Sequence, residues 1–227
     1  MNRGTPPPPE RWSSAQAAQH YRLGRWSSAR KAQRDPQRIG SILAHFLPPD
    51  ATALLLDAPC GTGRIRPTLE AHGSYLGLDV SAAMLTQARQ QANGRLVRGD
   101  IQRLPFRDDA FAAVICCRLL HHLDEAALTR SLCELVRVSR GLIVASFWDA
   151  ASLPEWKRRV LPSARASRRI ARSKIEIARA LAACGANVLA WRHSLRFVSR
   201  QAFVVARKRP RALDRDRAGA LAHERAP

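Results

Sequence analysis

Two glycines separated by a single residue, Gly61 and Gly63, follow an apolar run that ends at Asp57. Glycine permits a positive φ and lets the backbone approach a ligand closely, as a nucleotide-binding turn requires. Asp79 follows the next apolar run, about 20 residues further along, where a carboxylate can accept hydrogen bonds from ribose hydroxyls. These features together predict a site for a nucleoside-containing cofactor.

The class of cofactor follows from details of the same turn. A dinucleotide fingerprint that begins at Gly61 requires a third glycine at position 66, which is Arg66. Asp57 would also place a carboxylate beside the ligand, where it would repel a pyrophosphate. The same carboxylate suits a sulfonium cofactor that carries an amino group, because opposite charges attract. The residues therefore favour S-adenosylmethionine over NAD.

Each of these residues also has a structural alternative. Gly61 and Gly63 would be retained if the turn only had to pack closely between strand and helix. Asp79 could simply cap a helix that begins near Ser81, and Asp100 could be an ordinary loop carboxylate. The sequence leaves these alternatives open.

Two adjacent histidines, His121 and His122, are the next candidates for chemistry. Histidine can act as a general base or a metal ligand, and we expect His122 to be the base if the reaction uses one; the alternative is that the histidines have a structural function or line the cofactor. No cluster of cysteines or carboxylates completes a metal site, so we expect no metal. Cys116 and Cys117 lie in an apolar run and are expected to pack in the core.

The elements that position these residues alternate between strands and helices, which is typical of βαβ units and a parallel sheet. Ser81 and Asp124 are expected to begin helices, and Gly185 to end one. We predict a doubly wound α/β fold with a mostly parallel seven-stranded sheet and an antiparallel edge strand. The expected strands are 52–56, 75–78, 95–98, 111–117, 142–147, 187–197 and 201–207.

The domain boundaries follow from composition. Residues 1–10 are rich in proline and are expected to be disordered, and residues 209–227 form a charged tail. Between them we expect one domain, residues 11–208. Its segment 11–47 would form helices or a lid, and the basic segment 148–172 would border the acceptor.

The charge balance is strongly basic, with 38 Lys plus Arg against 18 Asp plus Glu and a formal net charge of +20. Such a field attracts nucleic acid, anionic lipid or acidic small molecules, although a compositional bias toward arginine explains it equally well. No apolar run approaches the roughly 18 residues of a membrane span, and residues 1–10 do not resemble a secretory signal. The five cysteines suggest no disulfide framework. We therefore expect a cytoplasmic protein.

Four segments together carry a family resemblance: LLLDAPCGTGR (54–64), LGLDVSAAML (76–85), RGDIQRLPF (98–106) and FAAVICCRLLHHL (111–123). In this order and spacing they resemble the class I S-adenosylmethionine-dependent methyltransferases. The branch that they are most similar to is the small-molecule one, which includes methyltransferases of ubiquinone and menaquinone biosynthesis.

The resemblance implies a cofactor site at the ends of four strands. Its residues would be Asp57, Gly61, Gly63, Asp79, Val80, Asp100, Ile101, Cys117 and Arg118. Asp57 and the glycines would cradle the methionine portion, with Cys117 and Arg118 on the same side. Asp79 would bind the ribose, Val80 would pack near the adenine, and Asp100 with the backbone of Ile101 would meet the adenine amino group. Pro59 departs from the family, which usually has a glycine there.

The resemblance further implies methyl transfer to a small-molecule or lipid-linked acceptor, for which an anionic group would suit the basic segment 148–172. The charge also fits an RNA methyltransferase, but the residues after the fourth strand do not form the NPPY-like motif of that class. A catalytically silent scaffold is a third reading. Peripheral contact with a membrane is compatible with the charge, and the oligomeric state is not predicted.

Overall fold

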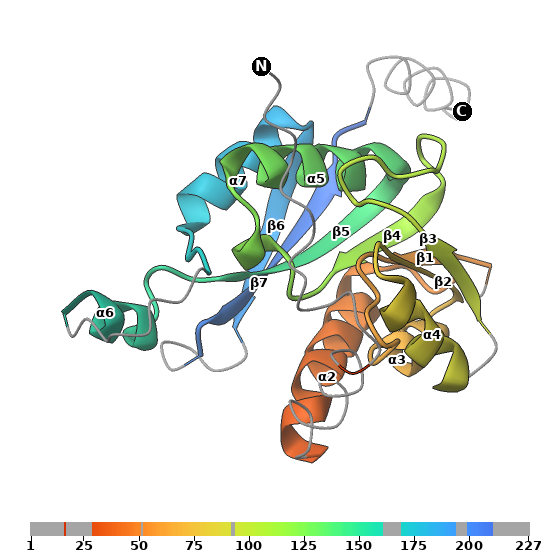
Figure 1. Cartoon of the computed structure of the whole chain (residues 1–227). Coiled ribbons are helices and arrows are strands. Elements are labelled where there is room, and N and C mark those ends of the chain that lie inside the picture. Colours follow the sequence, from red (N-terminus) through yellow and green to blue (C-terminus); the bar gives the residue numbers. More distant parts are fainter. Residues whose placement is uncertain are drawn as a thin grey trace, which may run out of the picture.

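The computed structural model describes residues 29–50, 52–91, 94–160, 169–193 and 199–210, together with residue 16. Its centre is a seven-stranded sheet in the order β3-β2-β1-β4-β5-β7-β6 (Figure 1). The strands are β1 (Leu54–Asp57), β2 (Ser74–Asp79), β3 (Arg95–Arg98), β4 (Phe111–Cys116), β5 (Ser139–Trp148), β6 (Ala186–His193) and β7 (Gln201–Lys208).

The sheet confirms the predicted fold class. Strands β1 to β5 are parallel, and β7 is antiparallel to both of its neighbours, β5 and β6. The edge strand β6 therefore runs in the same direction as the parallel strands. Because the carboxyl ends of β1, β2, β4 and β5 lie at one edge, the residues that follow them are brought to the same side of the molecule.

Helices cover both faces of the sheet. In Figure 1, α5 and α7 lie over one face, whereas α2, α3 and α4 lie over the other. The helical elements are α2 (Ala29–Phe46), α3 (Arg66–Glu70), α4 (Ala82–Gln91), the 3₁₀ turn η2 (Leu120–His122), α5 (Glu125–Val138), α6 (Leu153–Val160) and α7 (Lys174–Ala183). No helix among the residues that the structure describes is both long enough and apolar enough to cross a bilayer.

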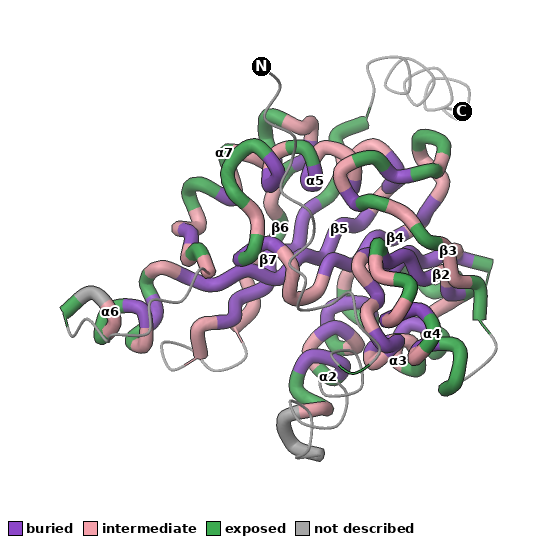
Figure 2. Tube along the Cα trace, in the orientation of Figure 1, coloured by how far each residue is buried: buried purple, intermediate pink, exposed green. Residues whose placement is uncertain are grey.

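The two-sided cover explains the unbroken apolar sequence of β4. Ala113 and Ile115 belong to the core beneath α2 and α3, whereas Val114 and Cys116 belong to the core beneath α5 and α7. Successive side chains of a strand point to opposite faces, so a strand buried on both sides has no polar position. Figure 2 shows this burial along the central strands.

The predicted helix starts are confirmed. The Oγ atom of Ser81 accepts a hydrogen bond from Met84 N at 3.2 Å, and the side chain of Asp124 accepts one from Ala127 N at 2.7 Å. Both side chains satisfy an amide that has no partner within the first turn of its helix. Gly185 ends α7 with a φ of 86°, as expected of a glycine after a helix.

The expectation of no disulfide is wrong, because Cys133 and Cys184 are bonded. Cys133 lies on α5 and Cys184 directly follows α7, and these two helices pack side by side on the same face of the sheet. The Cα atoms of the two cysteines are 4.7 Å apart, which is within the range that a disulfide spans. The sequence separation of 51 residues and the absence of a cysteine motif hid this pair.

Several expectations concern residues outside the described part of the chain. Disorder in residues 1–10, the lid function of residues 11–28 and the character of the tail after residue 210 stay predictions. The basic segment 148–172 is described except for residues 161–168.

Candidate functional site

A tight turn leads from β1 into α3 and is fastened to the end of β2. Cys60 N donates to Leu78 O at 2.8 Å, and Gly61 N donates to Asp79 Oδ2 at 2.8 Å. Pro59, the residue that departs from the pattern expected from the resemblance, follows a cis peptide bond. With Pro59 in this position, two amides of the turn donate hydrogen bonds to β2, one to its backbone and one to a side chain.

The two glycines of the turn adopt conformations that L-amino acids rarely adopt, with φ of 56° at Gly61 and 79° at Gly63. A Cβ atom at Gly61 would meet no atom within 4 Å, so close packing does not explain this glycine. A Cβ at Gly63 would contact Ala88 at an ordinary 3.5 Å. Backbone conformation is therefore the reason for glycine at both positions, and space lies open beside Gly61.

Asp57 ends β1 with a side chain that is fully buried. Its Oδ2 atom accepts a hydrogen bond from Tyr75 OH at 3.3 Å, whereas its Oδ1 atom has no partner among the described residues. Burial raises the pKa of Asp57 well above its ordinary value, against the smaller effects of the Tyr75 hydrogen bond and the Arg64 charge. A donor that reached Oδ1 would therefore stabilise the ionised form of this carboxyl group.

Asp79 ends β2 and joins two turns. Besides the bond from Gly61, its Oδ1 atom accepts from Ser81 N at 2.9 Å. Burial raises the pKa of Asp79, and the amide hydrogen bonds from Ser81 and Gly61 oppose that rise. Asp79 thus has a structural function at the start of α4, but a carboxylate has about four acceptor positions and two of them are used here.

The adenine-side residues of the prediction lie beyond the ends of β2 and β3. Gly99 N donates to Asp79 O at 3.1 Å, which joins the ends of the two strands. Val80 is 40% exposed, Ile101 is buried, and Asp100 is exposed with its Oδ1 accepting from Gln102 N at 2.9 Å. An exposed apolar side chain next to an exposed carboxylate is compatible with an adenine, although Asp100 also stabilises its own loop.

The residues that were predicted to lie on the methionine side follow β4. Arg118 has a φ of 63°, and its amide donates to Ser146 Oγ at 2.7 Å. Burial raises the pKa of Cys117 to about 12, so its thiol is neutral at physiological pH. A hollow of about 320 Å³, partly open to solvent, is lined by residues of the segment 59–65 and by Cys117 and Arg118.

An ion-pair cluster that sequence reasoning missed joins α2 to this hollow. Asp35 of α2 is 1% exposed and pairs with Arg64 Nη2 at 2.7 Å and with Arg118 Nε at 2.6 Å. Arg64 also donates to Ala32 O at 2.8 Å. These contacts fix α2 beside the glycine turn, and they fix the two arginines that line the hollow.

The two histidines differ in their environments. The ring of His121 is buried and stacks on Trp148, with centroids 4.7 Å apart and an angle of 10° between the planes. His122 is exposed in η2, just after β4. The residues that the structure describes contain no cluster of side chains able to hold a metal. Of the two, His122 is thus the one accessible to a substrate, and its catalytic function stays a prediction.

A second polar group lies beyond β5, on the side that was expected to border the acceptor. His193 Nε2 at the end of β6 lies 3.1 Å from Asp149 Oδ2, and Asp149 is buried. Sequence reasoning missed this pair, because no motif links residues 44 positions apart. The guanidinium groups of Arg169 and Arg200 lie over Trp148, at 5.0 and 5.2 Å from its ring centroid.

Comparison with known proteins agrees with this geometry. Residues 55–141 match the family model of a methyltransferase domain. The chain is 31% identical over 105 residues to a putative methyltransferase of Encephalitozoon cuniculi. The aligned segment covers 44% of this chain and 47% of that protein. It is 35% identical over 99 residues to a demethylmenaquinone methyltransferase of Lactiplantibacillus plantarum. This aligned segment covers 39% of this chain and 41% of that protein. The chain thus spans less than half the length of these curated relatives.

A solved structure with the same fold is the magnesium protoporphyrin IX methyltransferase of Synechocystis with bound SAH. Its TM-score is 0.65 at 17% identity, over 78% of this chain and 83% of that chain. The matched family segment contains the glycine turn and the ends of β1, β2 and β4. These are the places where the site residues were predicted.

Proposed function

We propose that this chain, whose residues 55–141 form a methyltransferase domain, transfers the methyl group of S-adenosylmethionine to a small-molecule or lipid-linked acceptor. The observation that carries the proposal is the buried carboxylate of Asp57 beside the open backbone of Gly61. Folding alone gives no reason to bury an acceptor without a partner, whereas a cationic ligand at the turn does.

The residues present fit the cofactor. The Oδ1 atom of Asp57 lacks a partner among the described side chains, so a donor that reaches it is stabilised, and the amino group of the methionine portion is such a donor. The hollow beside Cys117 would take that portion. Asp79 has free acceptor positions for the ribose hydroxyls, and the exposed Val80 offers an apolar surface for the adenine.

Bound S-adenosylmethionine supplies a methyl group on a sulfonium, which is an already activated leaving group. The work of the protein is therefore alignment and the exclusion of water, and alignment is worth roughly 7–11 kcal/mol. The glycine turn and Asp79 hold one reactant, and the ends of β4 and β5 border the other. His122 is exposed at this edge and would accept a proton from an oxygen or nitrogen nucleophile.

The proposal is tested by calorimetric titration with S-adenosylhomocysteine, with NAD as the control ligand. We expect micromolar binding of the former and none of the latter. Asp79→Ala should weaken binding by roughly 1.5–3 kcal/mol because it removes charge-assisted hydrogen bonds. Asp79→Asn is the intermediate variant, because it removes the charge and one of the two acceptor oxygens but keeps an oxygen that can accept from Gly61 N or Ser81 N.

Two outcomes would contradict the proposal. A folded protein that binds neither ligand would favour a catalytically silent scaffold. Binding of S-adenosylhomocysteine together with specific, tight RNA binding would favour an RNA methyltransferase, for which the net charge of +20 is the supporting observation.

A further inference from the structure

Helix α6, which follows β5, extends from the body of the molecule (Figure 1) and has two different faces. One face carries Glu155, which is 1% exposed. Its carboxylate lies 2.9 Å from Arg158 Nη2 and 3.1 Å from Nε of Arg200, the residue before β7. The helix is therefore attached to the sheet through this buried carboxylate.

The other face of α6 is apolar and exposed. The exposed fractions are 44% for Leu153, 56% for Trp156 and 56% for Val160. At 100° per residue these positions lie within about 60° of one another around the helix axis. Three of the seven large hydrophobic residues that are exposed in the described part of the chain thus form one stripe on an eight-residue helix.

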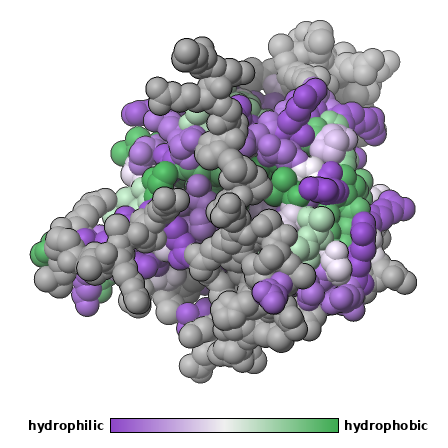
Figure 3. All heavy atoms as spheres, viewed as in Figure 1, coloured by the Kyte–Doolittle hydropathy of each residue, from purple (hydrophilic) through white to green (hydrophobic). Residues whose placement is uncertain are grey.

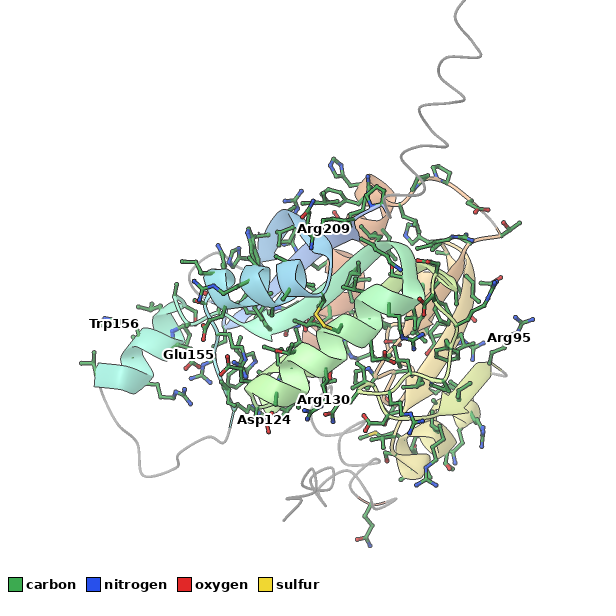
Figure 4. All side chains as sticks on the ribbon, turned by 90° about the horizontal axis from the view of Figure 1, so that it is seen from above. Arg95, Asp124, Arg130, Glu155, Trp156 and Arg209 are labelled. Carbon is green, nitrogen blue, oxygen red and sulfur yellow. A yellow bond between two sulfur atoms is a disulfide. The ribbon has the colours of Figure 1, made fainter. Side chains whose placement is uncertain are left out.

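A basic residue borders this stripe. Lys157 is exposed and lies next to the stripe, on the side away from Glu155. Figure 4 shows Trp156 at the outer end of the molecule, with Glu155 on the side of the sheet. Figure 3 shows hydrophobic side chains at this end of the surface, next to hydrophilic ones. An exposed apolar stripe with Trp and flanking Lys is the pattern of a helix that lies in a membrane interface.

We propose that α6 docks the protein onto an anionic lipid surface, with Leu153, Trp156 and Val160 inserted among the headgroups. Charge complementarity selects this occupant, since the chain carries a net charge of +20 and the stripe has a basic border. The indole of Trp156 combines an apolar ring with a polar N–H, which suits the boundary between lipid and water.

The position of α6 in the fold relates the proposed membrane contact to the proposed cofactor site. It begins five residues after the end of β5, at the edge of the sheet where the proposed cofactor site lies. Docking through α6 would turn this edge toward the lipid. If the proposed methyl transfer holds, the acceptor is therefore a lipid-linked molecule presented by the membrane; the docking itself does not depend on that activity.

The test is flotation of the full chain with vesicles of neutral phosphatidylcholine alone, or with about a third of anionic phosphatidylglycerol. We expect binding to the anionic vesicles. Trp156→Ser should reduce the partition coefficient about tenfold, and Lys157→Glu at least fivefold. Ile175→Ser is the matched apolar control, since Ile175 is 68% exposed on a different helix, α7, and Arg95→Glu on β3 is the matched charge control. Both should stay within about twofold of the wild type.

Other results would overturn the proposal. Equal losses for Lys157→Glu and Arg95→Glu, without any effect of Trp156→Ser, would mean nonspecific attraction by the net charge. Absence of vesicle binding, with a dimer in sedimentation that Trp156→Ser dissociates, would assign the stripe to a second copy of the chain. Loss of S-adenosylhomocysteine binding would contradict the proposed activity but not the docking, so the two failures are distinguishable.

Discussion

Replacing Asp57 with asparagine should make the ligand-free protein more stable. The wild-type side chain is fully buried, with one hydrogen bond from Tyr75 and one oxygen that has no partner among the described residues. Leaving a buried acceptor without a partner costs about 1–3 kcal/mol, and more when the group is charged. Asparagine has nearly the same shape, and although its amide would also bury one group without a partner, it carries no charge; we therefore expect the free energy of unfolding to rise by about 1–3 kcal/mol at neutral pH.

The pH dependence identifies the cause of this stabilisation. Burial raises the pKa of Asp57 in the folded state above its unfolded value. Its contribution to stability is then fully present below the unfolded pKa and is lost as the pH rises through the folded pKa. Below the unfolded pKa, wild type and Asp57→Asn should have nearly equal stability, because both side chains are neutral. Above the folded pKa, the variant should be more stable.

Urea unfolding of both proteins at about pH 3, below the unfolded pKa, and at about pH 8 measures the difference directly. For a chain of this size each kcal/mol also raises Tm by about 2–4 °C. The same variant should bind S-adenosylhomocysteine at least tenfold more weakly, roughly 1.5 kcal/mol, because the charge opposite the amino group is gone. A variant that is destabilised equally at both pH values would refute the reasoning, since Asp57 would then act as a neutral hydrogen-bonding group.

Two further predictions concern the links that fix the site and the helical layer. Asp35→Ala should lower the free energy of unfolding by about 3 kcal/mol. This is the lower end for a broken buried ion pair, because Arg64 and Arg118 keep some contact with water. The control Asp108→Ala breaks an exposed ion pair and should lower the free energy of unfolding by at most about 1 kcal/mol in the same urea experiment. Reducing the disulfide between Cys133 and Cys184 should lower the free energy of unfolding by up to about 4 kcal/mol, since this bond closes a loop of 51 residues. If reductant still destabilised the variant Cys133→Ser, the assignment of this effect to the disulfide would be contradicted.

The features that could be predicted from sequence are local. The bounds of β3, Arg95–Arg98, agree with the predicted strand 95–98. The helix starts at Ser81 and Asp124 were predicted because a capping side chain acts within three residues of its own position. The turn at Gly61 was predicted for the same reason, because the need for a positive φ is a property of a single residue.

The features that could not be predicted depend on contacts between distant segments. Asp35 and Arg118 are 83 positions apart, and nothing around Asp35 in the sequence distinguishes it from a solvent-exposed helix residue. The disulfide between Cys133 and Cys184 depends on α5 and α7 packing on the same face of the sheet. The partner of His193 depends on β6 ending on the same side as β5, which is decided by the insertion of β7 between them.

Two buried carboxylates near the hollow show how structure separates a structural acid from a ligand-binding one. Asp35 is buried between two guanidinium groups, so its charge is compensated within the protein. Asp57 is buried with a single hydroxyl donor, and its other oxygen has no partner among the described residues. Only the second arrangement leaves a buried carboxyl group without a compensating positive charge, which a bound cation would supply. For this reason Asp57→Asn should raise the free energy of unfolding and weaken ligand binding at the same time. Asp35→Ala, in contrast, should lower the free energy of unfolding.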